Sequence, residues 1–542
     1  MLRAITAVAE EAGLRADELR HYGPHIAKVT LEALQRRRDD PDGRVILVTS
    51  VNPTPAGEGK TVTAIALAQA LRSLGERPIV CLREPSMGPV FGLKGGATGG
   101  GRCTVEPADE INLHFTGDLH AVTAANNLLA AMLDDHIYRD RAPRPDVRRP
   151  ALHRVLDVND RALRRIVVGL NGGVPREEQF DITAASEVMA ILGLATDYAD
   201  LRRRLGRIIA GVTRERALIT ADDLHAGGAM AALLREALQP NLVQTQEGCP
   251  AFVHTGPFAN IAHGTSSLIS LLLAQKLGSR VVIEAGFGAD LGAEKFVHIV
   301  GGQGGPHPQV AVIVVTIRAL RYHGGGPVER LSDPQVPAVL AGLPQLEHHI
   351  EIVRRLHMRP LVCINTFPTD STDEVQAILE ASRVWNVPAA TSQAYTRGGD
   401  GTRELAELVR RADQEQAPGA SGGLYAPEAR LEEKLRIIAQ QVYGASEVTY
   451  AEPALRHLDE AERWGFRRLP VCVAKTQHSL TDQPHVRGVP SGFAIHIRDV
   501  EVRAGAGFVL ALAGDMQTMP ALPPHPRAWD IELDAAGAVR GL

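Results

Sequence analysis

Short runs of β-branched and other apolar residues recur along this chain, and segments with apolar residues at helical spacing separate them. A run with almost no polar position is typical of a strand that is buried on both faces, as in a parallel sheet covered by helices. We therefore predict an α/β fold with a mainly parallel sheet flanked by helices. The runs that predict its strands are residues 44–50, 78–82, 166–170, 281–284, 310–316, 361–365 and 471–474.

The first run ends at Ser50, and a loop rich in Pro and Gly leads from it to a helical segment that opens with Lys60-Thr61. This order of strand, loop and helix is that of a phosphate-binding loop (P-loop), in which backbone N–H groups face a polyphosphate. In such a loop the Lys60 ammonium adds a positive charge, and the Thr61 hydroxyl reaches Mg²⁺. The pattern usually begins with Gly where this chain has Thr54, and a tight structural turn is the alternative. We predict nucleotide binding by Thr54, Pro55, Ala56, Gly57, Glu58, Gly59, Lys60 and Thr61.

Breaks in the pattern divide the chain into three predicted domains, because 542 residues exceed what one hydrophobic core usually holds. Segments rich in Gly interrupt the pattern at residues 301–306 and 416–423. We predict a large P-loop-type domain over residues 1–305. Residues 306–425 would form a smaller α/β domain, and residues 426–542 a smaller C-terminal α+β domain.

Composition and charge argue against several classes of partner. The net charge is −5 and the pI is near 6.5, so nothing favours nucleic acid or an anionic membrane. The five cysteines are far apart and form no CxxC pair, which speaks against disulfides and a structural zinc site. The N-terminal segment lacks the continuous apolar stretch of a signal peptide, and the longest apolar runs are too short to span a bilayer. We therefore expect a cytoplasmic protein.

Polar residues just after the predicted strands are the candidates for chemistry, because ligands bind at the carboxyl ends of the strands in parallel sheets. Arg83 follows the strand at residues 78–82, where a guanidinium can hold a small carboxylate or a phosphoryl group in bidentate fashion. An ion pair with a neighbouring acid explains Arg83 equally well. Glu284 or Asp290 could supply a carboxylate that supports Mg²⁺, and a plain surface acid is the competing explanation.

Two further segments carry residues that often belong to sites. The glycine cluster at residues 91–101 costs backbone entropy, so it indicates either close approach of the backbone to a ligand or a mobile loop. His114 and His120 lie in a polar segment without an adjacent carboxylate or Cys at ligand spacing. We expect them to be interior histidines with satisfied hydrogen bonds rather than metal ligands.

A set of motifs in the same order over essentially the whole chain resembles the formate–tetrahydrofolate ligase family, also called formyltetrahydrofolate synthetases. The set is close to unique to that family. It includes Thr54 at the start of the P-loop, so the missing first Gly agrees with the resemblance. The matching segments are residues 54–61, 83–96, 109–118, 180–191, 250–264, 284–296, 474–477, 503–508 and 518–523.

The resemblance implies an ATP-dependent ligase that joins formate to N10 of tetrahydrofolate, with 10-formyltetrahydrofolate, ADP and phosphate as products and formyl phosphate as intermediate. Lys60 and Arg83 match the family's catalytic residues, and Thr61 would contact the Mg²⁺ of MgATP. The family forms homotetramers, and the resemblance leaves the need for a monovalent cation open. Two alternatives remain: another P-loop ligase or kinase that activates a small carboxylate as an acyl phosphate, and a binding protein or impaired relative without turnover.

The resemblance also implies a folate site with tetrahydrofolate as co-substrate. The family stacks the pterin between two aromatic side chains, which correspond here to Phe367 and Tyr395 and would place the folate site in the domain at residues 306–425. The second position is usually Trp, and Tyr keeps a π-face with less area. Other departures are Val62, Arg102, Thr104, His478 and Leu480, none of which removes a charged group assigned to the chemistry.

Overall fold

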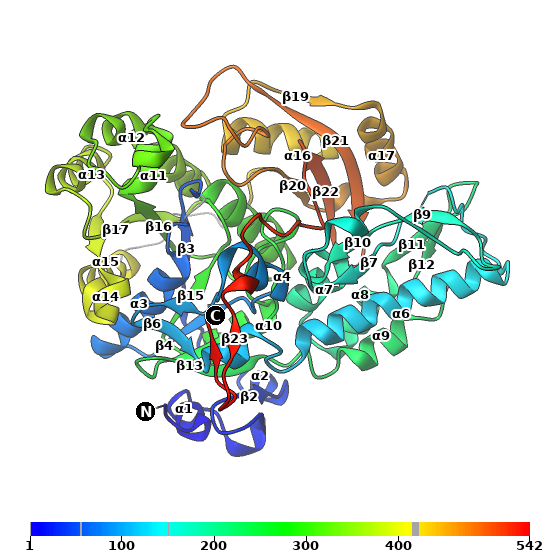
Figure 1. Cartoon of the computed structure of the whole chain (residues 1–542), viewed down its shortest axis with the longest axis horizontal. Coiled ribbons are helices and arrows are strands. Elements are labelled where there is room, and N and C mark those ends of the chain that lie inside the picture. The colour runs from blue at the N-terminus through cyan, green and yellow to red at the C-terminus, as the bar shows by residue number, and fades with distance from the viewer. Residues whose placement is uncertain (1, 55–56, 150, 415–421) are drawn as a thin grey trace.

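A sheet of twelve strands forms the centre of the computed structural model, which describes residues 2–54, 57–149, 151–414 and 422–542. Figure 1 shows the strands of this sheet in the left half of the view. Its strand order is β1 (Leu19–His21), β2 (Ala27–Val29), β13 (Asn241–Thr245), β14 (Pro250–Val253), β4 (Pro78–Leu82), β15 (Arg280–Glu284), β3 (Arg44–Ser50), β16 (Val310–Thr316), β17 (Arg359–Asn365) and β18 (Ala389–Ser392), while β6 (Cys103–Glu106) pairs with β13 and β5 (Gly99–Gly100) pairs with β6.

The strands from β14 to β18 in this order are parallel, and the strands before β14 are antiparallel. Every residue of β4 and β16 is buried, and so is every residue of β3 except the first. This is expected for strands covered on both faces. The prediction of an α/β fold with a mainly parallel sheet is thereby confirmed.

Helices cover both faces of the parallel part. On one face, α3 and α15 pack against β3, β4, β15 and β17, and on the other face α10 and α12 pack against β4, β15 and β16. Alternate residues of β3 show this directly, because Ile46 and Val48 belong to the core under α3, whereas Val45 and Leu47 belong to the opposite core. The helices are α1 (Ile5–Glu11), α2 (Glu32–Arg36), α3 (Lys60–Ser73), α4 (Met87–Pro89), α5 (Ala108–Asn112), α6 (Asp118–Tyr138), α7 (Glu187–Leu194), α8 (Tyr198–Gly206), α9 (Gly227–Leu233), α10 (Leu268–Leu277), α11 (Ile317–His323), α12 (Val336–Arg355), α13 (Thr372–Val384), α14 (Ala394–Arg397), α15 (Arg403–Gln414), α16 (Leu431–Ile438) and α17 (Glu452–Arg463).

One predicted strand lies outside the sheet. Residues 166–170 form only the short strand β8 (Ile166–Val168), which pairs with β9 (Arg176–Glu178) in an isolated hairpin. Val167 is 60% exposed, so the expectation of a strand buried on both faces is wrong here. An apolar run of three to five residues does not specify whether another layer covers it.

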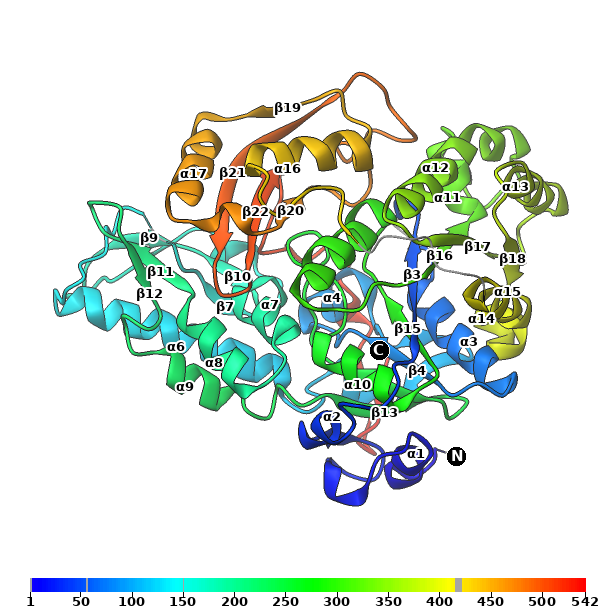
Figure 2. The same cartoon turned by 180° about the vertical axis from the view of Figure 1, so that it is seen from behind.

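Smaller sheets surround the central one. The C-terminal sheet has the order β19 (Glu447–Tyr450), β21 (Ala494–Arg503), β22 (Phe508–Ala513) and β20 (Val471–Ala474), with α16 and α17 packed against it. Figure 2 shows this sheet above the central one and an arm built from α6, α8 and α9 beside it. The remaining pairs are β7 (Arg154–Leu156) with β10 (Phe180–Ile182), β11 (Ile209–Val212) with β12 (Leu218–Thr220), and β23 (Glu532–Leu533) with β24 (Val539–Arg540).

The strands β16, β17 and β18 continue the sheet that β3 belongs to, whereas residues 447–513 build a separate sheet. The two predicted boundaries between the three domains stay predictions. All five cysteines are buried and free, which agrees with the absence of a disulfide framework. None of the helices in the described ranges combines the length and the apolar character that crossing a membrane requires.

Candidate functional site

The carboxyl ends of six neighbouring parallel strands meet at one edge of the central sheet, in the order β4, β15, β3, β16, β17 and β18. The register aligns these ends, since Glu284 lies opposite Val48, and Thr316 lies opposite Asn365. Each of these strands ends in, or is followed by, a candidate residue or loop from the sequence, or a residue in contact with such a candidate. Across the edge they are Arg83, Glu284, the loop at residues 51–59, Thr316, Phe367 and Tyr395.

Glycine is required at the end of the loop by its backbone conformation. Gly57 and Gly59 both have φ of +77°, a region that residues with a side chain rarely adopt. A Cβ on Gly59 would also lie 2.5 Å from Nδ2 of Asn365. Helix α3 begins at the next residue, Lys60, so the first N–H groups of this 14-residue helix open toward the sheet edge.

Glu58 ties the loop together from within. Its carboxylate accepts a hydrogen bond from the backbone N–H of Thr54 at 2.9 Å and one from Oγ1 of Thr316 at 2.6 Å. The side chain of Asn365 donates to the backbone carbonyl of Glu58 at 3.2 Å. The loop is therefore anchored to the ends of β16 and β17. Pro55 and Ala56, which the sequence also assigns to nucleotide binding, lie outside the described residues.

Glu284 joins the two predicted halves of the site. Its carboxylate accepts a short hydrogen bond of 2.5 Å from the Thr61 hydroxyl and forms an ion pair of 3.1 Å with Nη2 of Arg83. Lys60 donates to Oγ of Ser50 at 3.1 Å. Burial alone would raise the pKa of Glu284, but the charges of Arg83 and Lys60 outweigh this and hold its pKa below the ordinary range. The group is thus an ionised carboxylate between two cations and a hydroxyl.

Of the two explanations for Arg83, the ion pair is observed, and its partner is Glu284 rather than the neighbouring Glu84. The ion pair with Glu284 is made by Nη2, and the guanidinium has other N–H groups. Nη1 reaches only the Pro257 carbonyl at 3.4 Å, and Nε is buried without a hydrogen-bond partner. Arg83 therefore retains donors for a small anion at the end of β4.

The two predicted pterin-stacking residues follow neighbouring strands. Thr366 donates from its backbone N–H to the carbonyl of Ser392 at 3.0 Å, which holds the ends of β17 and β18 together. Phe367 is 37% exposed and Tyr395 is 58% exposed, unusual for aromatic rings beside a packed sheet. Both side chains are thus partly accessible to solvent at the same end of the site.

The glycine cluster lies against Tyr395. The backbone N–H of Arg102 donates to the Tyr395 carbonyl at 2.9 Å, and a Cβ on Gly101 would lie 2.0 Å from that carbonyl oxygen. A Cβ on Gly100 would lie 3.1 Å from the Tyr395 ring. The glycines here allow the backbone to approach the aromatic residue closely, and an approach of this segment to a ligand stays a prediction.

Known proteins resemble this chain over essentially its whole length. The model of the family described as "Formate--tetrahydrofolate ligase" matches residues 1–542. A protein named formate–tetrahydrofolate ligase from Thermus thermophilus is 51% identical over 100% of this chain and 98% of its own length. One of the same name from Nocardioides sp. is 50% identical over the same shares of the two chains.

The chain belongs to the formate–tetrahydrofolate ligase family. It is therefore an enzyme of the ligase class, as the sequence motifs predict. A solved structure of a mutant of L. casei FPGS covers 72% of this chain and 97% of its own, with 12% identity and a TM-score of 0.17. That likeness is too small to indicate a shared fold.

Of the two acids considered for Mg²⁺, only Glu284 lies beside the P-loop residues. Asp290 is fully buried, pairs with Lys475 at 2.8 Å and accepts a hydrogen bond from Asn52 at 3.1 Å. It thus connects the start of the loop to the C-terminal sheet. No group of three or more His, Cys, Asp or Glu residues suited to a metal ion occurs in the described part of the chain, so the contact of Thr61 with Mg²⁺ stays a prediction.

His114 and His120 are both exposed, so the expectation of interior histidines is wrong. His120 lies near the start of the long helix α6, whose outer face is open to solvent. Sequence reasoning also missed Arg318, whose guanidinium lies 5.6 Å from the centre of the Phe367 ring. The sequence signal that could have identified Arg318 was its position two residues after a predicted strand.

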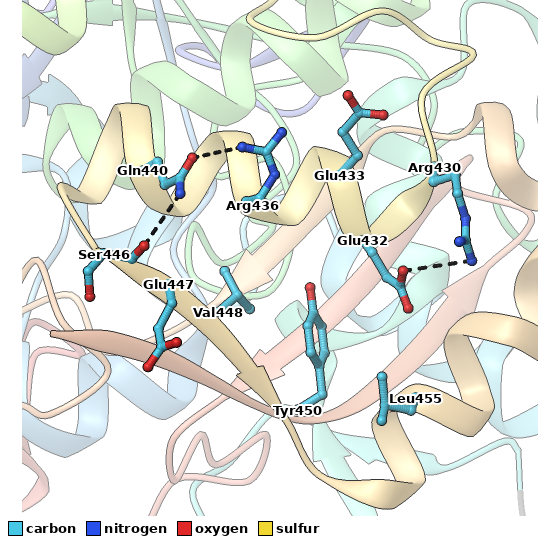
Figure 3. Close-up of a pocket in the computed structure, with 10 residues that line it drawn as sticks. All are labelled: Arg430, Glu432, Glu433, Arg436, Gln440, Ser446, Glu447, Val448, Tyr450 and Leu455. Carbon is cyan, nitrogen blue, oxygen red and sulfur yellow. Dashed lines mark hydrogen bonds and ion pairs between the residues drawn. The ribbon is translucent and has the colours of Figure 1, made fainter.

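A cavity of about 610 Å³ lies away from this edge, between α16, β19 and α17 of the C-terminal part (Figure 3). Its charged and polar side chains pair with each other. Arg436 donates to Gln440 at 2.9 Å, and Arg430 lies 3.7 Å from Glu432. None of the residues predicted for nucleotide, formate or folate lines it, and the candidate site remains the sheet edge.

Proposed function

We propose that this enzyme joins formate to N10 of tetrahydrofolate at the expense of ATP, giving 10-formyltetrahydrofolate, ADP and phosphate. The observation that carries the proposal is the order of groups along the sheet edge. Along that edge come Arg83 after β4, the anchored loop after β3, and two exposed aromatic rings after β17 and β18, with β15 and β16 between them. Family membership supports formate and tetrahydrofolate as the substrates.

In the first step, an oxygen of formate attacks the γ-phosphorus of MgATP, and the bond from that phosphorus to the β,γ-bridging oxygen breaks. ADP leaves, and formyl phosphate remains. Both reactants are anions, so catalysis consists mainly of positioning and charge neutralisation. Lys60 and the loop N–H groups would face the phosphates, Thr61 would reach the Mg²⁺ of MgATP, and Arg83 would hold formate and then formyl phosphate.

Glu284 would set the geometry of this step. It binds Thr61 and Arg83 with opposite oxygens of one carboxylate, so the metal-facing hydroxyl and the formate-facing guanidinium share a rigid anchor. Oxygen donors such as the Thr61 hydroxyl and the Glu284 carboxylate are those that Mg²⁺ prefers. The residues present therefore fit the Mg²⁺ that arrives with ATP.

In the second step, N10 of tetrahydrofolate attacks the formyl carbon, the bond from that carbon to the phosphate oxygen breaks, and N10 loses its proton. The pterin would stack between Phe367 and Tyr395. Strands in a sheet are about 4.8 Å apart, so β17 lies about 10 Å along the edge from β3. We infer that the folate lies along this edge, with its pterin at β17 and β18 and N10 directed toward the P-loop.

The remaining expectations belong to the same proposal. We propose a homotetramer in the cytoplasm, with nucleotide and formate bound by residues 1–305 and folate bound largely by residues 306–425, while residues 426–542 form the third domain. Whether a monovalent cation takes part is tested by comparing rates in potassium, sodium and tetramethylammonium salts. Gel filtration with light scattering tests the tetramer.

The deciding experiment measures 10-formyltetrahydrofolate and ADP with ATP, formate and tetrahydrofolate, each omitted in turn. Product that requires all three is the expected result. Release of ADP with another small acid and no folate would instead indicate a different carboxylate-activating ligase, and no turnover would indicate an impaired relative.

Two variants test the assigned roles. Lys60→Ala and Arg83→Ala should each lose at least about a hundredfold in turnover while folding normally, because each removes charge stabilisation made in the transition state. Arg330→Ala serves as a control, since Arg330 is exposed, pairs with Asp333 and has no role in the proposed reaction. Rates like those of the unmodified enzyme in both test variants would refute the roles.

A further inference from the structure

Arg318 places a positive charge beside the aromatic part of the site. It is the second residue of α11, directly after β16, and its guanidinium carbon lies 5.6 Å from the centre of the Phe367 ring. Among the described residues, Arg318 forms no ion pair and no hydrogen bond. Its only specific contact there is the face of an exposed ring.

The nearest acids have other partners. Asp370 accepts the backbone N–H of Phe367 at 2.8 Å and lies 3.5 Å from Nη2 of Arg321. Arg321 in turn forms a buried two-point pair with Glu374, at 2.8 and 2.6 Å. This network fixes the position of Phe367. The charge of Arg318 acts on the Asp370 carboxyl, but among the described residues no hydrogen bond or ion pair joins the two side chains.

A guanidinium in a partly buried position loses hydration, so it is normally balanced by an acid in direct contact. In the described part of the chain no acceptor contacts the donors of Arg318, which lie next to a ring on which a flat ligand would stack. An arginine suits this place, because its planar group lies against an aromatic face while its edge binds an anion.

We propose that Arg318 binds an anionic group of a substrate that lies beside Phe367, and so selects that substrate by charge as well as by shape. The inference rests on the proposed function. Two anions of that reaction can reach this point of the sheet edge: a carboxylate of the folate glutamyl tail and a phosphate of the nucleotide bound at β3, the adjacent strand. Arg318 is then a substrate-binding residue, and Asp370 is a residue that positions the ring beneath it.

The experiment compares Arg318→Gln and Arg318→Lys with the unmodified enzyme and with Arg330→Gln as a matched control at an exposed, ion-paired arginine. Titration calorimetry measures the binding of tetrahydrofolate monoglutamate, tetrahydrofolate triglutamate, ADP and 6-methyltetrahydropterin. The last of these carries the pterin without the anionic tail. Steady-state kinetics supply KM for ATP, formate and tetrahydrofolate separately.

Loss of a hydrogen bond to a charged group should weaken binding of one anionic ligand about tenfold or more in Arg318→Gln, with the neutral pterin changed less than twofold. Arg318→Lys should restore part of the loss, since it keeps the charge without the planar contact. A loss confined to the folates assigns the carboxylate, and a loss confined to ADP and to KM for ATP assigns the phosphate. KM for formate should not change, because formate is assigned to Arg83.

Unchanged binding of all ligands, or an equal loss for the neutral pterin and the anionic ligands, would overturn the proposal. The variant Phe367→Ala distinguishes a wrong role for Arg318 from a wrong proposed function. If Phe367→Ala abolishes pterin binding while Arg318→Gln does nothing, the folate site stands and the role of Arg318 does not. If the unmodified enzyme forms no 10-formyltetrahydrofolate, the proposed function itself fails.

Discussion

Replacing Glu284 by Gln tests whether one carboxylate aligns both halves of the site. The change keeps the size of the side chain and one acceptor oxygen but removes the charge that faces Arg83. With a relative exposure of 6%, Glu284 is shielded from water, and its ionised form is maintained by Arg83 and Lys60. The variant therefore releases Arg83 from a charged anchor and weakens the bond to Thr61.

The size of the effect follows from the contact. Two unit charges 3.1 Å apart attract by about 5 kcal/mol at an effective dielectric constant near 20, before the cost of desolvation is subtracted. Hydrogen bonds to charged groups contribute a net of about 1.5–3 kcal/mol. If that energy orients Arg83, kcat/KM for formate should fall by about ten- to a hundredfold in Glu284→Gln.

The assay measures formate-dependent ADP release and 10-formyltetrahydrofolate over a range of formate and ATP concentrations. Glu18→Gln is the matched control, because Glu18 is also a fully buried carboxylate paired with arginines, including Arg37 at 2.8 Å, but lies near the N-terminus. It should lower thermal stability and leave the kinetics unchanged. A kcat/KM for formate within twofold of the unmodified enzyme in Glu284→Gln would refute the shared anchor.

Further predictions concern the aromatic site, the buried network and pH. Phe367→Ala should raise KM for tetrahydrofolate about tenfold, because a stacking face is lost, and Tyr395→Trp should lower this KM about threefold, because the stacking face grows. A change in KM for ATP alone would argue against both predictions. Lys475→Met leaves the Asp290 carboxylate buried without its cation, so urea unfolding should show a loss of about 3–5 kcal/mol; a cost under 1 kcal/mol would contradict a stabilising pair. Burial lowers the pKa of His254 to about 4, so the folded state binds fewer protons than the unfolded state between pH 6.5 and 4, and stability falls as the pH drops through that window. Comparing unfolding of the unmodified protein and His254→Gln at pH 7.5 and 4.5 should show a smaller acid loss in the variant; equal losses would contradict the assignment.

Local patterns predicted the elements that carry the site, and they did so for a physical reason. The P-loop is contiguous, so Thr54, Gly59 and Lys60 appear in the sequence at the spacing that the strand, loop and helix require. The strand after which Arg83 lies was equally visible as an apolar run. The same local rule failed at residues 166–170, because an apolar run does not record whether another layer of the fold covers it.

The contacts that these residues make with distant parts of the chain could not be predicted from local sequence patterns. Glu284 lies more than two hundred positions from Thr61 in the chain, and only the parallel pairing of β15 with both β3 and β4 brings its carboxylate between Thr61 and Arg83. In the sequence, Asp290 and Glu284 were equal candidates for a carboxylate that supports Mg²⁺. The structure separates them, because one faces the sheet edge and the other is buried against Lys475.

By itself the sequence determined the class of fold and the family, and it predicted a phosphate-binding loop, since each depends on the type and spacing of neighbouring residues. Tertiary structure alone decided the order of groups along the edge, the position of Glu284 between Thr61 and Arg83, and the place of Arg318 beside Phe367. Those features depend on which strands are adjacent in the sheet. Strand order results from packing of the whole chain, and spacing within any one segment does not encode it.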